Sequence, residues 1–575
     1  MKKSFLVLLI MLLLSAIDSK ACTNFLVTKG ASADGSTFIT YAADSHIRYG
    51  ELYYTAARQW PATAMRTIYD RGTNAPRGKI PQIAQTYQVV GYINENQVAL
   101  GETTFGGREE LIDTTGLIDY GSLMFIALER SSTAREAIKI MADLVEEYGY
   151  GSDGETFSIS DPNEVWYMEL IGKGNDMKKD SNGKLYNADR GAVWVAIRIP
   201  DGYVSAHANQ ARITTFPMRD GVKSITDKDW DKLYDKDVEI IYKSEIVSFA
   251  RSKGYFEGSD EEFDFSAAFA PIDFSGARIC DLRVWMMFNA INDDMAKYWD
   301  YASGKDLTAE RMPLYVKPNR KITLDDMMGF MRNHFQDTEL DKSQGYGAGP
   351  FGSPYRWMPL YWEYEGEKYF HERPTSTQQT GFSFIAQCRS WLPNIIGGII
   401  WFGVDDTNST VYTPFYCSIT RVPEPFKAGN GDILSYSDSA AFWIFNRVAH
   451  FKYLFYDRVI HDIIRLQREL EHDYQQKVLE NDMKALSLLA MDRQSAIRAI
   501  TQFSISAGNN TFRRWKELDQ HLLVKFLDGN VKQEDKDGNF LRNPYGYPVR
   551  PQQPGYPDEW KKKVIEENPE RFKCK

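Results

Sequence analysis

Cysteine and histidine are scarce in this sequence, which has five cysteines and eight histidines among 575 residues. The cysteines are too scattered for a disulfide framework, and no group of cysteine or histidine residues has metal-ligand spacing. We therefore expect no metal and no other cofactor. One disulfide, between Cys388 and Cys417, is expected if the compartment is oxidising. The odd number of cysteines then leaves at least one free thiol, and Cys22 is the candidate for it.

Blocks of basic residues are also missing. The net charge is −10 at pH 7, and an acidic chain without a basic block argues against a nucleic-acid partner. Apolar runs are short, since residues 5–14 form an unbroken run of ten and residues 391–404 are interrupted by proline. Both runs are too short to span a bilayer as a helix, so we expect no membrane span.

The first 21 residues have the pattern of a signal peptide that is removed. Lys2 and Lys3 precede the apolar run, and Ser19-Lys20-Ala21 fits the small-x-small rule of signal peptidase. Cleavage there makes Cys22 the first residue, changes the net charge to −12 and predicts a periplasmic or secreted protein. The alternative is a lipoprotein lipidated at Cys22, although Ser19 and Lys20 match a lipid-attachment motif poorly.

A cysteine at the start of a chain carries its own base. Its α-amine has a pKa of about 7.7 to 8.0, so at neutral pH it can take the thiol proton. The thiolate can then attack an amide carbonyl, and the ammonium can protonate the leaving amine. The chemistry needs no histidine, and we expect Cys22 to be the nucleophile.

The order of predicted elements indicates an α+β fold. Residues 23–29 and 37–41 favour a β-hairpin around Asp34-Gly35, with Cys22 opening its edge, and residues 88–93 and 97–104 favour a second hairpin. A capping box, Thr133 to Glu136, predicts a helix over 133–148. Strands are predicted again at 156–160, 165–171, 192–199 and 203–206. Strands followed by one helix and more strands differ from a regular βαβ alternation.

Several motifs in the first half resemble one known family. Cys22-Thr23, Ala31-Ser32, Asp34-Gly35-Ser36 and Asp44-Ser45 are similar to the N-terminal signature of bacterial dipeptidases of the N-terminal-nucleophile class, relatives of penicillin V acylase and choloylglycine hydrolase. Residues 91–95, 101–104, 161–169, 207–212 and 283–285 resemble the same family in the same order. The resemblance implies a four-layer αββα sandwich with the nucleophile at the end of the first strand.

The resemblance divides the chain into a catalytic domain over 22–300 and a C-terminal extension over 301–575. For the extension we predict a helix over 323–335, buried strands at 382–388, 397–404 and 411–419, and a long helical stretch over 437–489. These elements are expected to complete the sandwich and to add helices that cap the pocket or form a homo-oligomer interface. Residues 534–575 are predicted to wrap the surface as an extended arm.

The same resemblance implies roles for four further residues. Asn209 is expected to donate to the oxyanion of the tetrahedral intermediate, with Thr104 or its backbone amide as a second donor. Asp44 is expected to hold the α-ammonium. Arg283, or alternatively Arg278, would place positive charge near the thiol and lower its pKa.

One departure from the family pattern concerns substrate binding. Many relatives carry an Arg-Asn-Glu triplet just before the aspartate, whereas this chain has Tyr41, Ala42 and Ala43. The role of the missing arginine therefore passes to another residue or is lost. We expect Tyr41, His46 and Thr104 to line the substrate pocket.

These observations predict a secreted cysteine dipeptidase that hydrolyses dipeptides or other small amides. An N-acyl amide hydrolase of the penicillin V acylase or bile-salt hydrolase type is an alternative, because the same groups cut any small exposed amide. A surface lipoprotein that binds glycans or peptides without cleaving them is a second alternative. Acylation of Cys22 would remove the α-amine base, so that amine distinguishes the enzyme from the lipoprotein.

Overall fold

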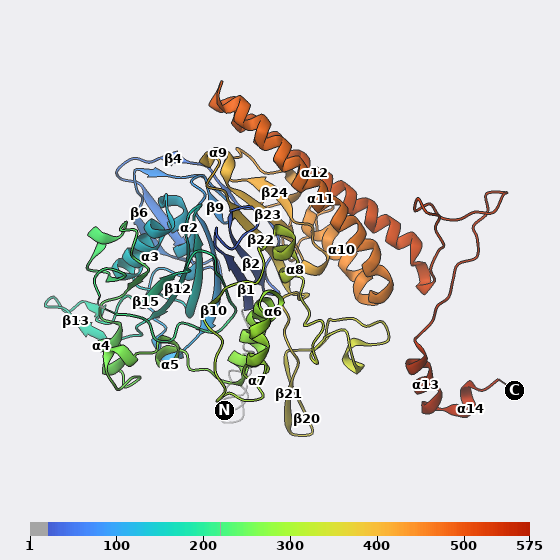
Figure 1. Ribbon diagram of the computed structural model, residues 1–575, viewed down its shortest axis with the longest axis horizontal. Coiled ribbons are helices and arrows are strands. Elements are labelled where there is room, and N and C mark those ends of the chain that lie inside the picture. The colour runs from blue at the N-terminus through green and yellow to red at the C-terminus, as the bar shows by residue number, and fades with distance from the viewer. Residues whose placement is uncertain (1–20, 219, 575) are drawn as a thin grey trace, which may run out of the picture.

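The computed structural model describes residues 21–218 and 220–574, which form a mixed α+β fold built on two large sheets (Figure 1). The seven-stranded sheet has the order β19 (Tyr315–Val316), β16 (Val204–His207), β1 (Ala21–Val27), β2 (Thr37–Asp44), β22 (Thr380–Cys388), β23 (Ile399–Val404) and β24 (Thr413–Tyr416). The nine-stranded sheet has the order β17 (Ser224–Thr226), β18 (Ile240–Tyr242), β15 (Ala192–Arg198), β12 (Val165–Gly172), β11 (Gly154–Ser160), β10 (Ala99–Gly106), β9 (Ile93–Asn94), β8 (Val89–Val90) and β3 (Tyr54–Thr55).

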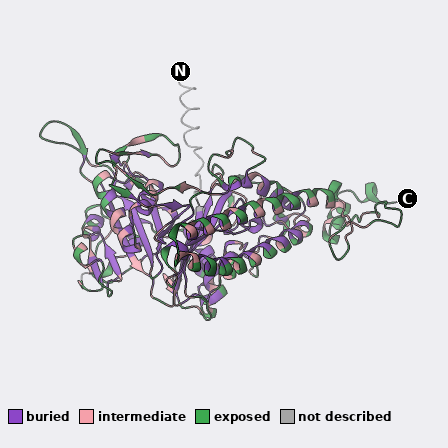
Figure 2. Ribbon diagram, turned by 90° about the horizontal axis from the view of Figure 1, so that it is seen from above, coloured by how far each residue is buried: buried purple, intermediate pink, exposed green. Residues whose placement is uncertain are grey.

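The two sheets pack face to face, with β1 and β2 against β10 and β11. Side chains on β1 alternate between the two faces of the strand. The Sγ atom of Cys22 faces Glu102 of β10, whereas the ring of Phe25 packs on the outer face against Phe330, with 5.8 Å between ring centroids. The strands of both sheets are largely buried (Figure 2). The nucleophile candidate therefore lies between the sheets.

Helices cover the outer faces of the sheets. The nine-stranded sheet packs against α2 (Tyr120–Arg130) and α3 (Ala134–Tyr148). The seven-stranded sheet packs against α6 (Leu282–Ile291), α10 (Ala441–Leu454), α11 (Tyr456–Leu489) and α12 (Arg493–Lys525), with α8 (Leu324–Met331) over Phe25. Shorter helices are α4 (Ile246–Ser252), α5 (Phe265–Phe269), α7 (Trp299–Ala302) and α9 (Asn394–Gly397). Three hairpins are β5–β6 (Met65–Tyr69, Pro76–Pro81), β13–β14 (Met177–Lys179, Leu185–Asn187) and β20–β21 (Tyr361–Tyr364, Glu367–Phe370), and β4 (Arg58–Gln59) pairs with β7 (Gln85–Thr86).

Most of the local predictions for the first half are confirmed, but residues 88–93 fall in two short paired strands, β8 and β9, and α2 was not predicted. β1 and β2 form the expected hairpin, whose turn places Gly35 at φ 83°, a conformation that favours glycine. Thr133 caps α3, because its Oγ1 accepts from the backbone N–H of Glu136. β1 lies inside the sheet rather than at its edge, since β16 pairs with it from Asn24 onward.

Two predictions for the second half need correction. The stretch 437–489 is two helices, because Phe455 leaves the helical conformation with φ −148° and ψ 57°. Cys388 and Cys417 are free thiols, and their Sγ–H groups donate to the carbonyl oxygens of Gln97 and Asn394. None of the described residues 534–574 is buried, but the segment lies against the rest of the chain, since Tyr556 packs on Phe351 and Trp560 packs on Tyr346. It carries α13 (Asp558–Glu567) and α14 (Pro569–Phe572), set apart from the sheets in Figure 1.

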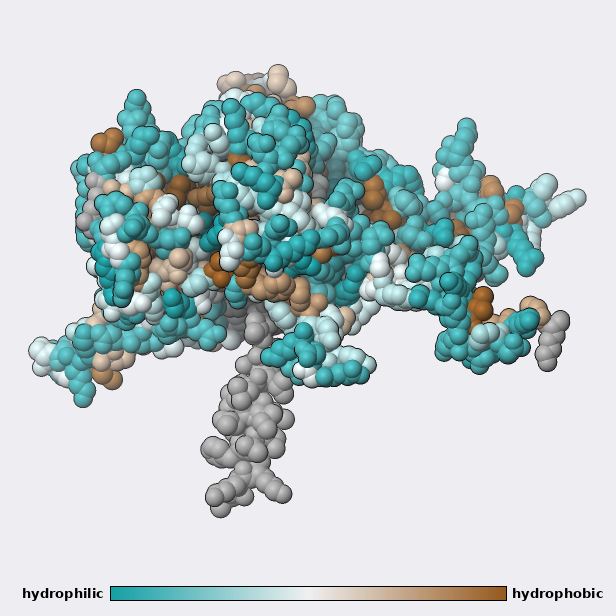
Figure 3. All heavy atoms as spheres, turned by 60° about the horizontal axis from the view of Figure 1, so that its bottom comes forward, coloured by the Kyte–Doolittle hydropathy of each residue, from teal (hydrophilic) through white to brown (hydrophobic). Residues whose placement is uncertain are grey.

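The face that carries the β20–β21 hairpin is mostly hydrophilic, with apolar residues in scattered patches (Figure 3). No helix in the described part of the chain has the length and hydropathy needed to cross a membrane. Of the predicted signal peptide, residues 1–20 lie outside the described residues, so its removal stays a prediction.

Candidate active site

Cys22 lies near the start of β1 and is buried, with 7% of its surface exposed. Its Sγ atom is 3.7 Å from the hydroxyl oxygen of Tyr41 and 3.8 Å from Oε1 of Glu102. The Tyr41 hydroxyl also donates to the same Glu102 oxygen at 2.6 Å. The thiol therefore shares a polar cluster with one phenol and one carboxyl group between the two sheets.

This cluster disfavours the thiolate. Burial raises the pKa of the Cys22 thiol well above its usual value, and the negative charges of Glu102 and Asp44 raise it further. Hydrogen bonds from the backbone N–H of Asp44 and from Tyr41 act in the opposite direction and are smaller. Ionisation of this thiol at neutral pH therefore needs a base or a positive charge beside it.

Asp44 ends β2 and pairs with Ala21, directly beside the start of Cys22. Its Oδ1 accepts from the hydroxyl of Thr380 at 2.6 Å, and its Oδ2 is 3.5 Å from a guanidinium nitrogen of Arg373. Burial raises the pKa of Asp44 to about 6, while the charge of Arg373 lowers it. The negative charge of Asp44 raises the pKa of the Cys22 thiol, so the carboxyl group lies near the nucleophile candidate.

A chain of hydrogen bonds joins the other predicted residues. The guanidinium of Arg283, fully buried on α6, donates to the carbonyl oxygen of Cys22 at 2.8 Å and to Oδ1 of Asn209 at 2.9 Å. The amide of Asn209 donates to the carbonyl oxygen of Thr104 at 2.6 Å. Arg278 instead contacts Glu372 at 2.9 Å. Of the two candidate arginines, Arg283 is the one that touches Cys22.

Cys22 opens into a cavity of about 230 Å³. Tyr41, Thr104 and His46, the three residues predicted to bind substrate, all lie in its wall, and His46 is exposed. Their roles stay predictions. The wall also includes Asp44, Ser45, Arg48, Glu102, Tyr120, Pro359, Leu360 and Gln379.

Four charged residues near the site had no predicted role: Arg48, Glu102, Glu155 and Arg373. Glu102 lies in the quoted motif 101–104, and strand alternation could have placed it on the same face as Thr104. Glu155 accepts from the Thr104 hydroxyl at 2.7 Å. Burial raises the pKa of both glutamates, and the charge of Glu102 raises that of Glu155 further. Arg373 comes from a loop distant in sequence and carries no local signal.

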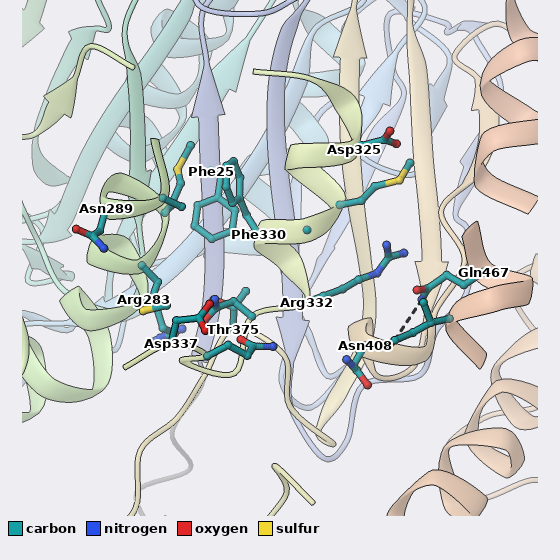
Figure 4. Close-up of a pocket in the computed structure, with 18 of the residues that line it drawn as sticks. Phe25, Arg283, Asn289, Asp325, Phe330, Arg332, Asp337, Thr375, Asn408 and Gln467 are labelled. Atoms are coloured by element: carbon teal, nitrogen blue, oxygen red, sulfur yellow. Dashed lines mark hydrogen bonds between the residues drawn. The ribbon is translucent and has the colours of Figure 1, made fainter. Parts of the chain in front are cut away.

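A cavity of about 930 Å³ lies on the other face of β1. Figure 4 shows Phe25 and Phe330 over it, with Arg283 on one side and Asn408 and Gln467 on the other. Because Phe25 and Cys22 point to opposite faces of the strand, the thiol does not line this cavity. Arg283 lies in the wall of this cavity, and its guanidinium also donates to the backbone carbonyl oxygen of Cys22.

One cluster has metal-ligating atoms close together, formed by Asp462, His521 and Glu534. The ammonium of Lys525 lies 2.7 Å from Asp462 and 2.8 Å from Glu534, so a cation already fills the space between the carboxylates. The cluster joins α11, α12 and the segment after α12, and it is a structural ion-pair network.

In this α+β protein the Cys22 thiol, the Tyr41 phenol and the carboxyl groups of Asp44 and Glu102 line one small cavity. Groups of these types can carry out amide hydrolysis. Residues 21–469 match the model of Peptidase family C69. The chain belongs to this family and is a peptidase, which confirms the resemblance to bacterial dipeptidases of the N-terminal-nucleophile class.

Relatives that are named as dipeptidases match this chain over most of their own length. The chain is 24% identical to a probable dipeptidase of Latilactobacillus sakei over 72% of this chain and 77% of that protein. It is 24% identical to a probable dipeptidase of Salmonella dublin over 69% and 81% of the two chains. It is 25% identical to dipeptidase A of Lactobacillus helveticus over 85% and 94%.

Proposed function

We propose that this peptidase is a cysteine dipeptidase that acts in the periplasm or outside the cell, with the Cys22 thiolate as nucleophile and the α-amine of Cys22 as general base. Removal of residues 1–21 would free that amine. The names of the relatives support the reaction, and the buried thiol in a small polar cavity supports the nucleophile. The thiol in this cavity is the observation that carries the proposal.

The fold proposal is the four-layer αββα sandwich of N-terminal-nucleophile hydrolases. Its support is the contact of β1 and β2 with β10 and β11, with α2 and α3 outside one sheet and α10 to α12 outside the other. In such a sandwich the nucleophile lies between the two sheets, as the thiol of Cys22 does.

The mechanism follows from the pKa of the thiol. Because burial and two carboxyl groups raise it, the α-amine must lie next to Sγ to accept the proton, and the resulting ammonium then offsets the negative charges. Asp44 lies beside that position and would bind the ammonium.

The thiolate then attacks the scissile carbonyl carbon, forming a C–S bond and an oxyanion. The Asn209 amide, fixed by Arg283 and by the Thr104 carbonyl, would donate to that oxyanion. Collapse breaks the C–N bond, and the ammonium protonates the leaving amine. Water, deprotonated by the same α-amine, then hydrolyses the thioester and restores the thiol.

The names of the relatives favour a dipeptide over the substrates of acylases. A lipid on Cys22 fits the structure poorly, because the residue is 7% exposed and its Sγ faces Tyr41 and Glu102. The dipeptidase is therefore preferred to both alternatives.

The test is the intact mass and N-terminal sequence of the exported protein, before and after exposure to a small alkylating reagent. A chain that begins at Cys22, is alkylated at Cys22 as well as at the exposed Cys574, and then loses dipeptide hydrolysis supports the proposal. Cys22→Ser should fold normally and lose most activity, because a hydroxyl is a poorer nucleophile beside this base. A lipid mass increment, a different first residue or an active Cys22→Ser variant would overturn it.

A further inference from the structure

A second cavity of about 540 Å³ adjoins the Cys22 cavity. The two cavities share four wall residues: His46, Pro359, Leu360 and Gln379. We call the second cavity the vestibule. Its wall is formed mainly by residues 354–360 and 371–379, on either side of the β20–β21 hairpin. A group that extends from the thiol past the shared wall enters the vestibule.

The vestibule is lined by more cations than its carboxylates can neutralise. Lys342, Arg356 and Arg373 lie in its wall together with one acidic residue, Glu372. The Glu372 carboxylate is paired with Arg278 at 2.9 Å, outside the wall. Arg373 faces Asp44 at 3.5 Å. Two of the three cations, Lys342 and Arg356, then have no carboxylate partner among the described residues.

Lys342 and Arg356 contact only uncharged groups. The ammonium of Lys342, whose residue is 2% exposed, donates to the carbonyl oxygen of Glu372 at 2.8 Å and lies 3.1 Å from Nδ1 of His371. The guanidinium of Arg356 donates to carbonyl oxygens, including that of Lys342 at 2.9 Å. Burial and the charge of Arg356 lower the pKa of Lys342 to about 7. At this value the Lys342 amine is about half protonated at pH 7, and a bound anion would raise its pKa again.

The Cys22 cavity has the opposite balance. Asp44 and Glu102 line it, and Arg48 is its one arginine, bonded to the hydroxyl of Tyr120 at 3.0 Å. The whole chain has a net charge of −10, so an uncompensated basic cavity is unlike the rest of the protein. The two adjoining cavities therefore present carboxylates on the thiol side and cations on the vestibule side.

From this juxtaposition we infer that the vestibule binds an acidic side chain on the second residue of the dipeptide, so that the enzyme favours X-Glu and X-Asp substrates. The inference rests on the proposed function. A dipeptide extends about 7 Å at most, so its own α-carboxylate stays near the scissile bond in the Cys22 cavity. The second side chain is the part that can pass the shared wall.

The test compares kcat/KM for Ala-Glu with that for the uncharged isostere Ala-Gln. We expect the wild-type protein to prefer Ala-Glu by about tenfold or more, as charge-assisted hydrogen bonds allow, and the preference should shrink in high salt. Arg356→Gln and Lys342→Met should bring the ratio toward one. Lys368→Met is the matched control, because this exposed lysine of β21 lies outside the vestibule wall, and it should keep the ratio.

The position of the acidic residue gives a second comparison. The ratio of Glu-Ala to Gln-Ala should not change between wild type and Arg356→Gln, because the inference places only the second side chain in the vestibule. Equal rates for Ala-Glu and Ala-Gln in wild type, or a full preference in a folded Arg356→Gln variant, would overturn the inference while leaving the dipeptidase intact. If the wild-type protein cleaved none of the four dipeptides, that result would instead count against the proposed function. If Lys342→Met does not fold, the Ala-Glu to Ala-Gln ratio of Arg356→Gln alone tests the inference.

Discussion

Arg283 holds Cys22 by its backbone: Nη1 of the arginine donates to the carbonyl oxygen of Cys22 at 2.8 Å. Nη2 of the same guanidinium donates to Asn209 at 2.9 Å. Sequence reasoning expected Arg283 to lower the thiol pKa, whereas the largest effects on that pKa are burial, Glu102 and Asp44. The geometry favours Arg283 as a positioning residue that fixes the nucleophile relative to the amide.

Arg283→Lys should therefore reduce kcat by roughly 10²-fold, the cost of a displacement of about 1 Å in a catalytic group. A lysine ammonium cannot reproduce the two-pronged contact of the guanidinium. The rate of Cys22 alkylation should change much less than kcat, because alkylation needs no aligned amide. Arg278→Lys is the matched control, and an equal loss of kcat in that variant would contradict the role.

Asn209→Ala should lower kcat by about 10² to 10³, as the loss of one oxyanion donor does in other hydrolases. Its KM should change little, because the donor acts on charge that develops after binding. Alkylation of Cys22 forms no oxyanion and serves as the internal control. A fall in alkylation as large as the fall in kcat would show that Asn209 supports the local structure instead.

Glu102→Gln should accelerate alkylation of Cys22 at a fixed pH. The negative charge of Glu102 raises the pKa of the thiol, and glutamine keeps the shape and accepts from Tyr41 without that charge. Each unit by which the thiol pKa falls gives about ten times more thiolate. The measurement is the pH profile of alkylation.

Glu155→Gln is the comparison for the Glu102 experiment. The charge of Glu102 raises the pKa of Glu155, and the hydrogen bond from Glu155 lowers the pKa of Glu102, so Glu155 carries the proton of the pair. A glutamine at position 155 can donate in place of that carboxyl group and leaves Glu102 ionised. Alkylation should then stay the same or slow. Acceleration by Glu155→Gln as large as that by Glu102→Gln would show that general loosening of the site, and not the charge on Glu102, controls the thiol.

The sequence predicts those parts of the molecule whose signals are local. Turn chemistry at Gly35 and the cap at Thr133 give the β1–β2 hairpin and α3, since each depends on residues a few positions apart. The roles of Cys22 and Arg283 near each other could be predicted because both residues lie in segments that resemble one family. Cys388 and Cys417 do not form the expected bridge, because sequence distance says nothing about which way two thiols point.

Parts of the site that depend on chain folding over long distances were not predictable. Arg373 reaches Asp44 from the loop after β21, and no pattern around either residue indicates the pair. The break in the helix at Phe455 could not be predicted from the sequence either, because the apolar period continues from α10 into α11. Tertiary packing decides both features.

His334 gives a prediction about stability outside the site. This histidine is buried, neither ring nitrogen has a hydrogen-bond partner among the described residues, and its ring packs against Tyr355 at 5.4 Å. Burial lowers its pKa from 6.5 to about 3. Above pH 6.5 the ring is neutral in folded and unfolded chains and has no effect on the pH dependence of stability. Below that pH the unfolded chain takes up the proton first, so the folded state loses stability as the pH falls toward 3.

His334→Phe removes this titration without breaking a hydrogen bond of the ring. Relative to the wild type, its free energy of unfolding should rise as the pH is lowered from 6.5 to 4, by up to about 1.4 kcal/mol per pH unit. Asp44 and other groups titrate in both proteins, so the difference isolates His334. Denaturant unfolding at pH 8, 6 and 5 measures it. His334→Gln removes the same titration with a different shape, so both variants should share the pH dependence whatever their offset at pH 8. A difference that stays constant between pH 8 and 5 in both variants would show that His334 is protonated as readily in the folded as in the unfolded chain.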